Sequence, residues 1–313
     1  MDRISHIFLW ILAAICVVSC VDDFTPDVKD APEPRLVIDG LLTTEPGAHR
    51  VRLSMSAPFG TSSSQLPIVS GAGVSIWDGE KTVTLVEDPG TGCYYTPDDY
   101  YGQEGRTYRL DVDVDIEGEH RHYSAEDTMP PKGIRADAMD YYRMTDSLWM
   151  FAIWGQDLPG IASHYAGELV VHGHRLPVGQ WVFIDGLSMF DGNYLFAGEY
   201  LPYICSSLIP SEEPLTPLVE GDEVTLFFYS LSDFFYSWIL AMTNETNARI
   251  PMLSSQPANL PSNIQGDDVT GCFVLADLTK VTIQIIDPDR TREDMLRDHL
   301  PAGYLVPQGG NQD

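Results

Sequence analysis

Hydrophobic and polar residues alternate along much of this chain, most clearly over residues 108–116. Because successive side chains of a strand point to opposite faces, this alternation predicts a β-strand with one buried face and one solvated face. The apolar positions are Tyr108, Leu110, Val112, Val114 and Ile116, and the polar ones are Arg109, Asp111, Asp113 and Asp115. Gly118 marks a tight turn, after which residues 122–125 are expected to pair back.

Shorter segments of the same pattern occur before this strand, at residues 36–40, 51–55, 74–76 and 82–86. The dipeptide Asp78-Gly79, between the last two, is typical of a hairpin turn. Short strands spaced by about 8 to 12 residues, with Gly and Pro between them, predict a β-sandwich. We therefore expect an N-terminal β-sandwich domain over residues 35–129.

Pro130 and Pro131 favour a domain boundary, because proline interrupts a strand and stiffens the joint. A second β-rich domain is predicted over residues 133–300. Its candidate strands are residues 134–142, 148–154, 165–172, 180–184 and 223–229. The fold class that these patterns predict is mainly β.

One amphipathic helix is predicted in the second domain, over residues 232–243. Its apolar side chains form a single stripe at helical spacing: Phe234, Phe235, Trp238, Ile239 and Met242. Ser232 is a suitable N-cap, and Asp233 follows it at the positive end of the helix dipole. The stripe favours core packing over ligand contact.

The N-terminus has the features of a secretory signal over residues 1–19. Arg3 precedes an apolar run at residues 7–18, which is too short to span a bilayer. Cys20 at the first mature position predicts a lipoprotein, whose acyl chains, palmitate among them, would hold it at about 0.8 kcal/mol per buried CH2. The alternative is a plain secretory signal with a chance cysteine. Residues 20–34 are predicted to be a tether and residues 301–313 a flexible tail.

The charge of the chain limits its partners. Its 313 residues carry a net charge of -28. Such an acidic surface repels phosphate backbones and argues against a nucleic-acid partner. It favours solubility, and it could also attract cations.

The cysteines give no metal-binding spacing. After Cys20, the chain keeps Cys93, Cys205 and Cys272. The odd number leaves at least one thiol free or paired between chains. A disulfide between Cys205 and Cys272 is one option that the sequence leaves open.

Several stretches in order resemble one family. They are Arg35-Leu36-Val37-Ile38-Asp39-Gly40, Gly71-Ala72-Gly73, Gly92-Cys93-Tyr94-Tyr95, Gly105-Arg106-Thr107-Tyr108, the segment 256–264 and Gly271-Cys272-Phe273. Together they resemble the DUF4249 family of Bacteroidota surface lipoproteins. Asp267-Asp268 and Cys272 depart from the family pattern, which is glycine-rich at the first and small or aromatic at the second.

This resemblance implies an outer-membrane lipoprotein that faces outward and acts beside a TonB-dependent receptor in nutrient uptake. It implies an immunoglobulin-like or carboxypeptidase-regulatory-like sandwich in the N-terminal half, and it supplies no catalytic residues. Asp22 and Asp23, directly after Cys20, resemble the acidic export signal of such lipoproteins. A solvated acidic tether is the alternative for these two residues.

Candidate chemistry is sparse in the sequence. The chain has no Gly-x-Ser-x-Gly, His-Glu-x-x-His, phosphate-loop or dinucleotide motif. On one strand, His172 and His174 would share a face with Glu168 and could bind a metal. Gly173 makes a loop equally plausible there, with solvated histidines.

Three other features have two interpretations each. The carboxylate row of Asp111, Asp113 and Asp115 could bind calcium or could be an ordinary wet sheet face. The tyrosines at 94, 95, 100 and 101 could form a recognition surface or core and rim. The loop around Asn263 could line a site, but its prolines favour a buttress.

We therefore expect a non-enzymatic accessory of a TonB-dependent uptake system that binds substrate or docks on the receptor. The cofactor expectation is none beyond the lipid at Cys20, with calcium kept open. The alternative function is a surface adhesion or structural lipoprotein without a transport role. A surface hydrolase is a third hypothesis, which would require an acid, a base and water within a well-formed pocket.

Overall fold

The computed structural model describes residues 33–57, 65–132, 138–145, 148–156, 163–171, 174–175, 182–185, 194–202, 218–247 and 260–299. The signal, Cys20, the acidic pair at 22–23 and the predicted tail lie outside these residues. Residues from Pro34 onward are grouped as one unit by their contacts. No described helix is long and apolar enough to cross a membrane.

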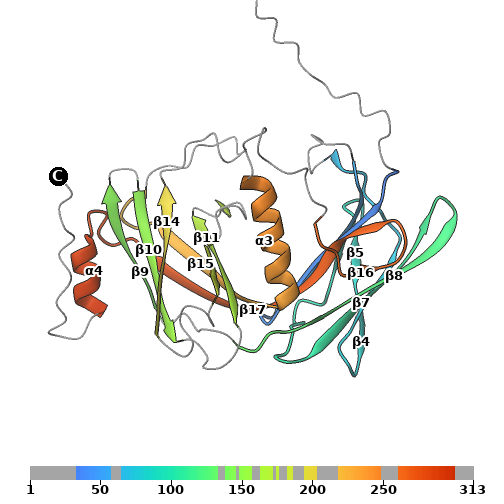
Figure 1. The fold of residues 1–313 in the computed structure, drawn as a ribbon, viewed down its shortest axis with the longest axis horizontal. Helices are drawn as coiled ribbons and strands as arrows, with labels where there is room; N and C mark the ends of the chain where they lie inside the picture. The colour runs from blue at the N-terminus through green and yellow to red at the C-terminus, as the bar shows by residue number, and fades with distance from the viewer. Residues whose placement is uncertain are drawn as a thin grey trace, which may run out of the picture. The chain divides into compact units, whose positions relative to one another are not determined.

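The first half of the chain is built of short strands (Figure 1). They are β1 (Leu36–Thr43), β2 (Arg50–Met55), β3 (Gly73–Trp77), β4 (Thr82–Thr84), β5 (Val86–Asp88), β6 (Cys93–Tyr95), β7 (Thr107–Ile116) and β8 (Glu119–Thr128). The long alternating segment forms β7 as predicted and pairs with β8 along its full length. The predicted hairpin around Asp78-Gly79 is confirmed as β3 and β4.

The second half contains strands and both described helices. They are β9 (Ala138–Thr145), β10 (Leu148–Gln156), β11 (His164–Val171), β12 (His174–Arg175), β13 (Val182–Asp185), β14 (Tyr194–Pro202), β15 (Glu223–Leu231), α3 (Asp233–Asn247), β16 (Ile264–Gln265), β17 (Val269–Gln284) and α4 (Arg292–His299). The mainly β fold class is confirmed.

The strands form three sheets. The large sheet has the order β12-β11-β15-β17-β1-β2-β6-β5, with β13 also paired to β11. A five-stranded sheet has the order β16-β8-β7-β3-β4, and a three-stranded sheet the order β14-β10-β9. The large sheet therefore contains strands from both halves of the chain.

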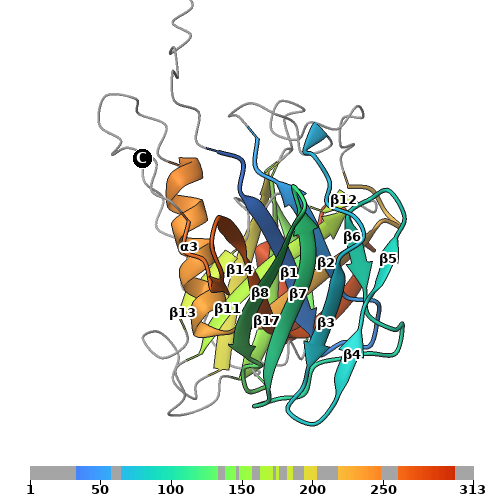
Figure 2. The ribbon, with the colours of Figure 1, turned by 90° about the vertical axis from the view of Figure 1, so that its right-hand side faces the viewer.

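A β-sandwich is confirmed in the N-terminal half. Side chains of β1 and β2 share one core with side chains of β3, β7 and β8 from the five-stranded sheet. In Figure 2, β7 and β8 lie in front of β1 and β17. The alternation in β7 explains the packing, because Leu110, Val112 and Val114 are buried while the aspartates between them lie outside the core.

The long strand β17 joins the two halves. It pairs in parallel with β1 and antiparallel with β15. One of its faces packs at one end in the sandwich core, through Phe273 and Leu275, and at the other end against the core of β9 and β10, through Val281 and Ile283. Between these ends the same face carries Asp277 and Thr279. β17 thus pairs with strands of both predicted domains. Whether the chain divides into two independently folding domains at residues 129–133 stays a prediction.

The opposite face of β17 is covered by α3. Phe235 and Ile239 of the helix pack with Cys272, Val274 and Ala276 of the strand. The Ser232 hydroxyl accepts a hydrogen bond from the amide of Phe235 at 3.2 Å, so the predicted N-cap and the core role of the stripe are confirmed. The helix runs to Asn247, four residues beyond the predicted end.

A second helix, α4, corrects the expectation of one helix. The Thr291 hydroxyl accepts the amide hydrogen of Asp294, and the Asp294 carboxylate accepts the amide hydrogen of Thr291. This reciprocal arrangement is a capping box, and Thr-x-x-Asp in the sequence was its signal. The prediction missed α4 because the segment is short and its surroundings are strongly polar.

Two residues of the family-like segments hold β1, β8 and β17 together. Gly271 has a φ of 104°, and a Cβ there would overlap the carbonyl oxygen of Ile38, so only glycine permits this close parallel pairing. The Asn263 amide group donates to the Phe273 carbonyl at 2.7 Å and accepts from the Phe273 amide at 3.0 Å. The amide thus takes the place of a strand neighbour, and the buttress interpretation of this loop is confirmed.

Candidate functional site

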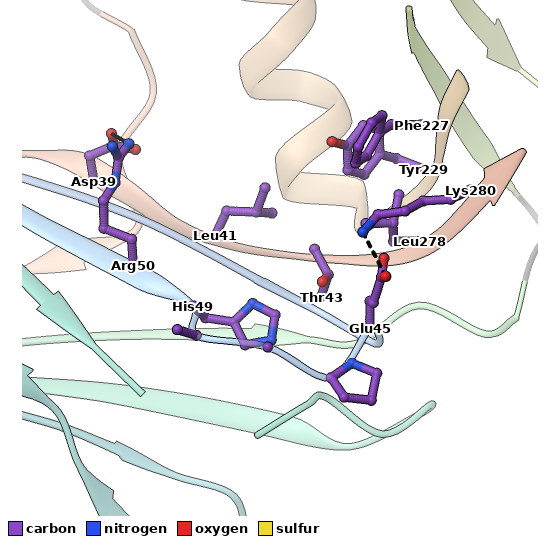
Figure 3. A pocket seen from close by; sticks show the side chains of 13 residues that line it. Asp39, Leu41, Thr43, Glu45, His49, Arg50, Phe227, Tyr229, Leu278 and Lys280 are labelled. Carbon is purple, nitrogen blue, oxygen red and sulfur yellow. Dashed lines mark ion pairs between the residues drawn. The ribbon is translucent and has the colours of Figure 1, made fainter. Parts of the chain in front are cut away.

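A cavity of about 360 Å³ opens on the α3 side of the large sheet, and we call it the sheet cavity (Figure 3). It is lined by Asp39, Leu41, Thr43, Glu45, Pro46, Gly47, Ala48, His49, Arg50, Phe227, Tyr229, Leu278 and Lys280. These residues come from β1, the connection that follows it, the start of β2, β15 and β17. The site is therefore assembled from segments that are about 180 residues apart in sequence and joined by strand pairing.

Charged groups of the sheet cavity are held in ion pairs. Lys280 Nζ lies 2.6 Å from Glu45 Oε1 and 5.0 Å from the centre of the Phe227 ring. Arg50 lies 3.8 Å from Asp39. All four charged side chains are about one-third to three-fifths exposed, so each pair is worth at most about 1 kcal/mol. A polar ligand could open either pair at low cost.

His49 fixes the wall of the sheet cavity. Its Nε2 lies 3.2 Å from the carbonyl oxygen of Tyr100, and its backbone amide donates to the Thr96 hydroxyl at 2.9 Å. Burial lowers the pKa of His49 from 6.5, against the opposing effect of the carbonyls of Tyr100 and Glu45. The imidazole is thus neutral at neutral pH and serves as a positioning group for the 44–49 connection.

A second cavity lies on the other side of that connection. It measures about 670 Å³ and is lined by Thr44, Glu45, Pro46, Tyr101, Gly102, Gln103, Glu104, Lys132, Asp277, Leu278 and Thr279. We call it the junction cavity, because it contains the polar stretch of β17 between the two cores. Glu45, Pro46 and Leu278 line both cavities.

Neither cavity was identified from the sequence. Their residues lie on strands and connections whose contacts depend on the β1–β17 pairing, and β17 was absent from the predicted strands. One signal was available, namely Asp277 and Thr279 inside an alternating apolar segment. Polar residues on an otherwise apolar strand face mark either a solvent opening or a site.

The predicted metal site at 168–174 does not have the assumed geometry. β11 ends at Val171, and His174 lies on β12, which runs antiparallel to β11, so one continuous strand does not carry both histidines. His172 and the His174 side chain lie outside the described residues. Glu168 is only 3% exposed and accepts a hydrogen bond from the Tyr229 hydroxyl at 3.2 Å.

The carboxylate row of β7 faces basic groups of its own hairpin. Asp113 lies 2.9 Å from His122 Nδ1, and Asp115 lies 3.0 Å from His120 Nδ1. Asp111 accepts from Arg109 at 3.0 Å. This cross-strand ladder supports the wet-face interpretation over calcium. Across the described ranges, no group of three or more His, Cys, Asp or Glu side chains could hold a metal ion.

The clustered tyrosines have different roles. Tyr94 is in the sandwich core, and its hydroxyl accepts from the Ala72 amide at 3.0 Å. Burial raises the pKa of Tyr100. Tyr101 is 46% exposed and lines the junction cavity. The core-and-rim interpretation therefore holds for Tyr94, whereas Tyr101 is available for contact.

The cysteines of the described part are free thiols. Cys93 and Cys272 are both buried, and Cys272 forms no disulfide with Cys205, which lies outside the described residues. Burial raises the pKa of Cys272 to about 12, with a smaller effect from Asp39 and Asp127. This thiol is thus protonated and unreactive at neutral pH.

Comparisons with solved structures give distant similarities. A segment of two fibronectin type III domains from chicken tenascin is 10% identical, covers 63% of this chain and 90% of its own, and has a TM-score of 0.19. A DUF4785 family protein from Legionella pneumophila is 6% identical, covers 61% of this chain and 48% of its own, and has a TM-score of 0.21. Both TM-scores are too low to support an argument.

No curated protein matches the chain. Residues 21–282 match a domain of unknown function, DUF4249, and this range includes both cavities, α3 and all but the last two residues of β17. The chain belongs to the DUF4249 family.

Proposed function

We propose that this protein is a lipid-anchored outer-membrane protein that faces outward and acts as a non-enzymatic accessory of a TonB-dependent nutrient uptake system. It would bind substrate or dock on the receptor. The observation that carries the proposal is the position of Cys20, directly after a basic start and an apolar run. The proposal also relies on the resemblance of the chain to surface lipoproteins, with Asp22 and Asp23 as the export signal.

The sheet cavity supports the binding part of the proposal. It combines aromatic walls, Phe227 and Tyr229, with exposed ion pairs that a ligand or partner could open. His49 carries no positive charge at neutral pH, and its Nε2–H donates to a backbone carbonyl. The aromatic walls and the two ion pairs suit ligand binding. Each charged side chain is exposed for contact and has an ion-pair partner when no ligand is bound.

The anchor is tested by labelling cells with an alkyne fatty acid and replacing Cys20→Ala. We expect label on the parent protein and none on the variant, because the thioether bond to lipid requires the thiol. Ser19→Ala is the matched control, since it keeps a small residue before the cleavage point and should keep the label. Label on the Cys20→Ala variant would refute the anchor.

The outward orientation and the partner need two further measurements. Protease added to intact cells should remove the parent protein, and Asp22→Asn with Asp23→Asn should protect it while leaving the lipid label unchanged. Purification in mild detergent should then recover a barrel-sized outer-membrane receptor. If no receptor copurifies and growth on scarce nutrients is normal without the protein, the adhesion or structural role replaces the transport role.

A further inference from the structure

The junction cavity occupies the gap between the two cores on one face of β17. Four separate segments form it: residues 44–46, residues 101–104, Lys132 after the proline pair, and residues 277–279. Its volume of about 670 Å³ is within the range of about 300–1,000 Å³ that is usual for small-ligand sites. It is therefore large enough for a ligand of several linked groups.

Asp277 is a buried carboxylate on the wall of this cavity. It is 6% exposed, and the Thr44 hydroxyl donates to its Oδ1 at 2.7 Å. The Thr44 oxygen also accepts the amide hydrogen of Leu278 at 3.0 Å, which fixes the direction of the hydroxyl. Within the described ranges, no Lys, Arg or His lies within ion-pair distance of Asp277.

A buried carboxylate with one hydroxyl donor and no counter-ion is a favourable partner for a cation that arrives from outside. The nearest lysine along the same strand, Lys280, does not supply a counter-ion. It lies on the opposite face of β17 and is paired with Glu45 in the sheet cavity. Asp277 is thus an oriented anion whose charge is uncompensated in the part of the chain that the structure describes. Its position suits an ammonium group of a ligand.

Lys132 supplies the opposite charge in the same cavity. Its side chain is exposed, and it has no ion pair with any described carboxylate. The cavity therefore contains a carboxylate, Asp277, and a cation, Lys132, that do not neutralise each other directly. Two further carboxylates line it, namely Glu45, which is paired with Lys280, and Glu104. Tyr101, 46% exposed, and Leu278 add apolar surface beside these groups.

We propose that the junction cavity binds a zwitterion, namely an amino acid or a short peptide with free ends. The ammonium group contacts Asp277, the carboxylate contacts Lys132, and the apolar part lies against Tyr101. A simple anion would be repelled by the net charge of -28, and a simple cation would leave Lys132 unmatched. The inference goes beyond the transport role and does not depend on it, because it concerns binding alone.

The test is calorimetric titration of the full-length protein in detergent with L-phenylalanine and with trialanine. In L-phenylalanine the ammonium and the carboxylate are bonded to the same carbon, whereas in trialanine they are at the two ends of a peptide. The two probes therefore distinguish an amino-acid ligand from a short-peptide ligand. N-acetylated and C-amidated forms of each probe remove one charge at a time. We expect saturable binding of one unblocked probe and loss of about tenfold or more in affinity on blocking either end.

Variants assign the binding to this cavity. Asp277→Asn keeps an acceptor for Thr44 but removes the charge, and Lys132→Gln removes an exposed charge with no effect on the core. Each should weaken binding by about tenfold. Lys81→Gln, which removes an exposed lysine that lines neither cavity, is the matched control and should leave affinity unchanged. Thermal melting of every variant reports whether the fold is retained.

Three outcomes would overturn the inference. Neither unblocked probe binds saturably, or blocking the ends has no effect, or Lys132→Gln binds as the parent does. The last outcome remains decisive if Asp277→Asn fails to fold, because Lys132 is exposed. None of these results bears on the anchor at Cys20, so failure here is distinguishable from failure of the proposed function.

Discussion

The two cavities share Glu45, Pro46 and Leu278 but differ in how their charges are compensated. In the sheet cavity, Lys280 and Arg50 are each paired with a carboxylate. In the junction cavity, Asp277 is buried with one hydroxyl donor, and Lys132 forms no ion pair within the described ranges. The difference follows from the alternation of β17, which places Lys280 and Asp277 on opposite faces of one strand.

This contrast indicates different responses to change. Exposed, paired charges can be lost with little effect on folding, because water replaces the partner. A buried carboxylate and its single donor cannot be separated so cheaply, because the acceptor is left without a hydrogen bond. The junction cavity is therefore the more specific environment, and the sheet cavity the more adaptable one.

The largest effect is expected from Gly271→Val, which should disrupt the β1–β17 pairing on which both cavities depend. A side chain there would overlap the Ile38 carbonyl at a φ of 104°, and the β1–β17 pairing would separate. We expect a loss of more than about 3 kcal/mol in unfolding free energy, or failure to fold. Urea unfolding followed by tryptophan fluorescence measures the loss.

Gly47→Ala is the control for this change. Gly47 lines the sheet cavity, and a Cβ there would meet no atom within 4 Å. Its stability should stay within about 0.5 kcal/mol of the parent protein. A Gly271→Val protein as stable as the Gly47→Ala protein would show that the parallel pairing does not support the fold.

A smaller effect is expected from Thr44→Val, which changes only the junction cavity. The substitution removes the donor to Asp277 and the acceptor for the Leu278 amide while keeping the shape of the side chain. We expect a loss of about 1–3 kcal/mol, because two partly buried polar groups lose their partner. Chemical unfolding of this variant is the measurement.

Lys280→Gln provides the paired comparison in the sheet cavity. Because its ion pair with Glu45 is well exposed, the expected loss is below about 1 kcal/mol. The order of the two losses tests the contrast between the cavities. An equal or larger loss for Lys280→Gln would contradict it.

The smallest effect is a pH dependence at His49. Its folded-state pKa is lowered from 6.5, so the unfolded chain takes up the proton first as pH falls. The stability linked to the neutral imidazole is therefore complete above about pH 6.5 and declines as pH falls below that value. Unfolding midpoints of the parent and of His49→Gln, measured from pH 7.5 to about pH 5, should converge on acidification. A constant difference between the two unfolding midpoints over this pH range would show that protonation of His49 is not coupled to unfolding.

Local pattern allowed much of the fold to be predicted. The alternation in 108–116 determined β7 and its buried face, and the apolar stripe with Ser232 determined α3 and its cap. Asn263 was correctly interpreted as a buttress, although its partner Phe273 could not be named. The short helix α4 was missed, although its capping box was present in the sequence.

The candidate site could not be predicted in the same way. Asp277 and Thr44 are 233 residues apart, and no local pattern brings them together. The histidine pair at 172 and 174 had suggestive spacing, but β11 ends at Val171 and His174 lies on the antiparallel strand β12, so the assumed common face is lost. Likewise, the aspartates of β7 had suggestive spacing, but the neighbouring strand brings histidines to them.

The sequence by itself determined the strand faces, the cap of α3, the overall acidity and the signal that ends at Cys20, because each depends on residues close along the chain. Only the tertiary structure decided that β17 lies between β1 and β15 and that its polar stretch, Asp277 with Thr279, opens into a cavity between two cores. The physical reason is that a strand pattern fixes which way side chains point, whereas the partners they meet depend on pairing between distant segments.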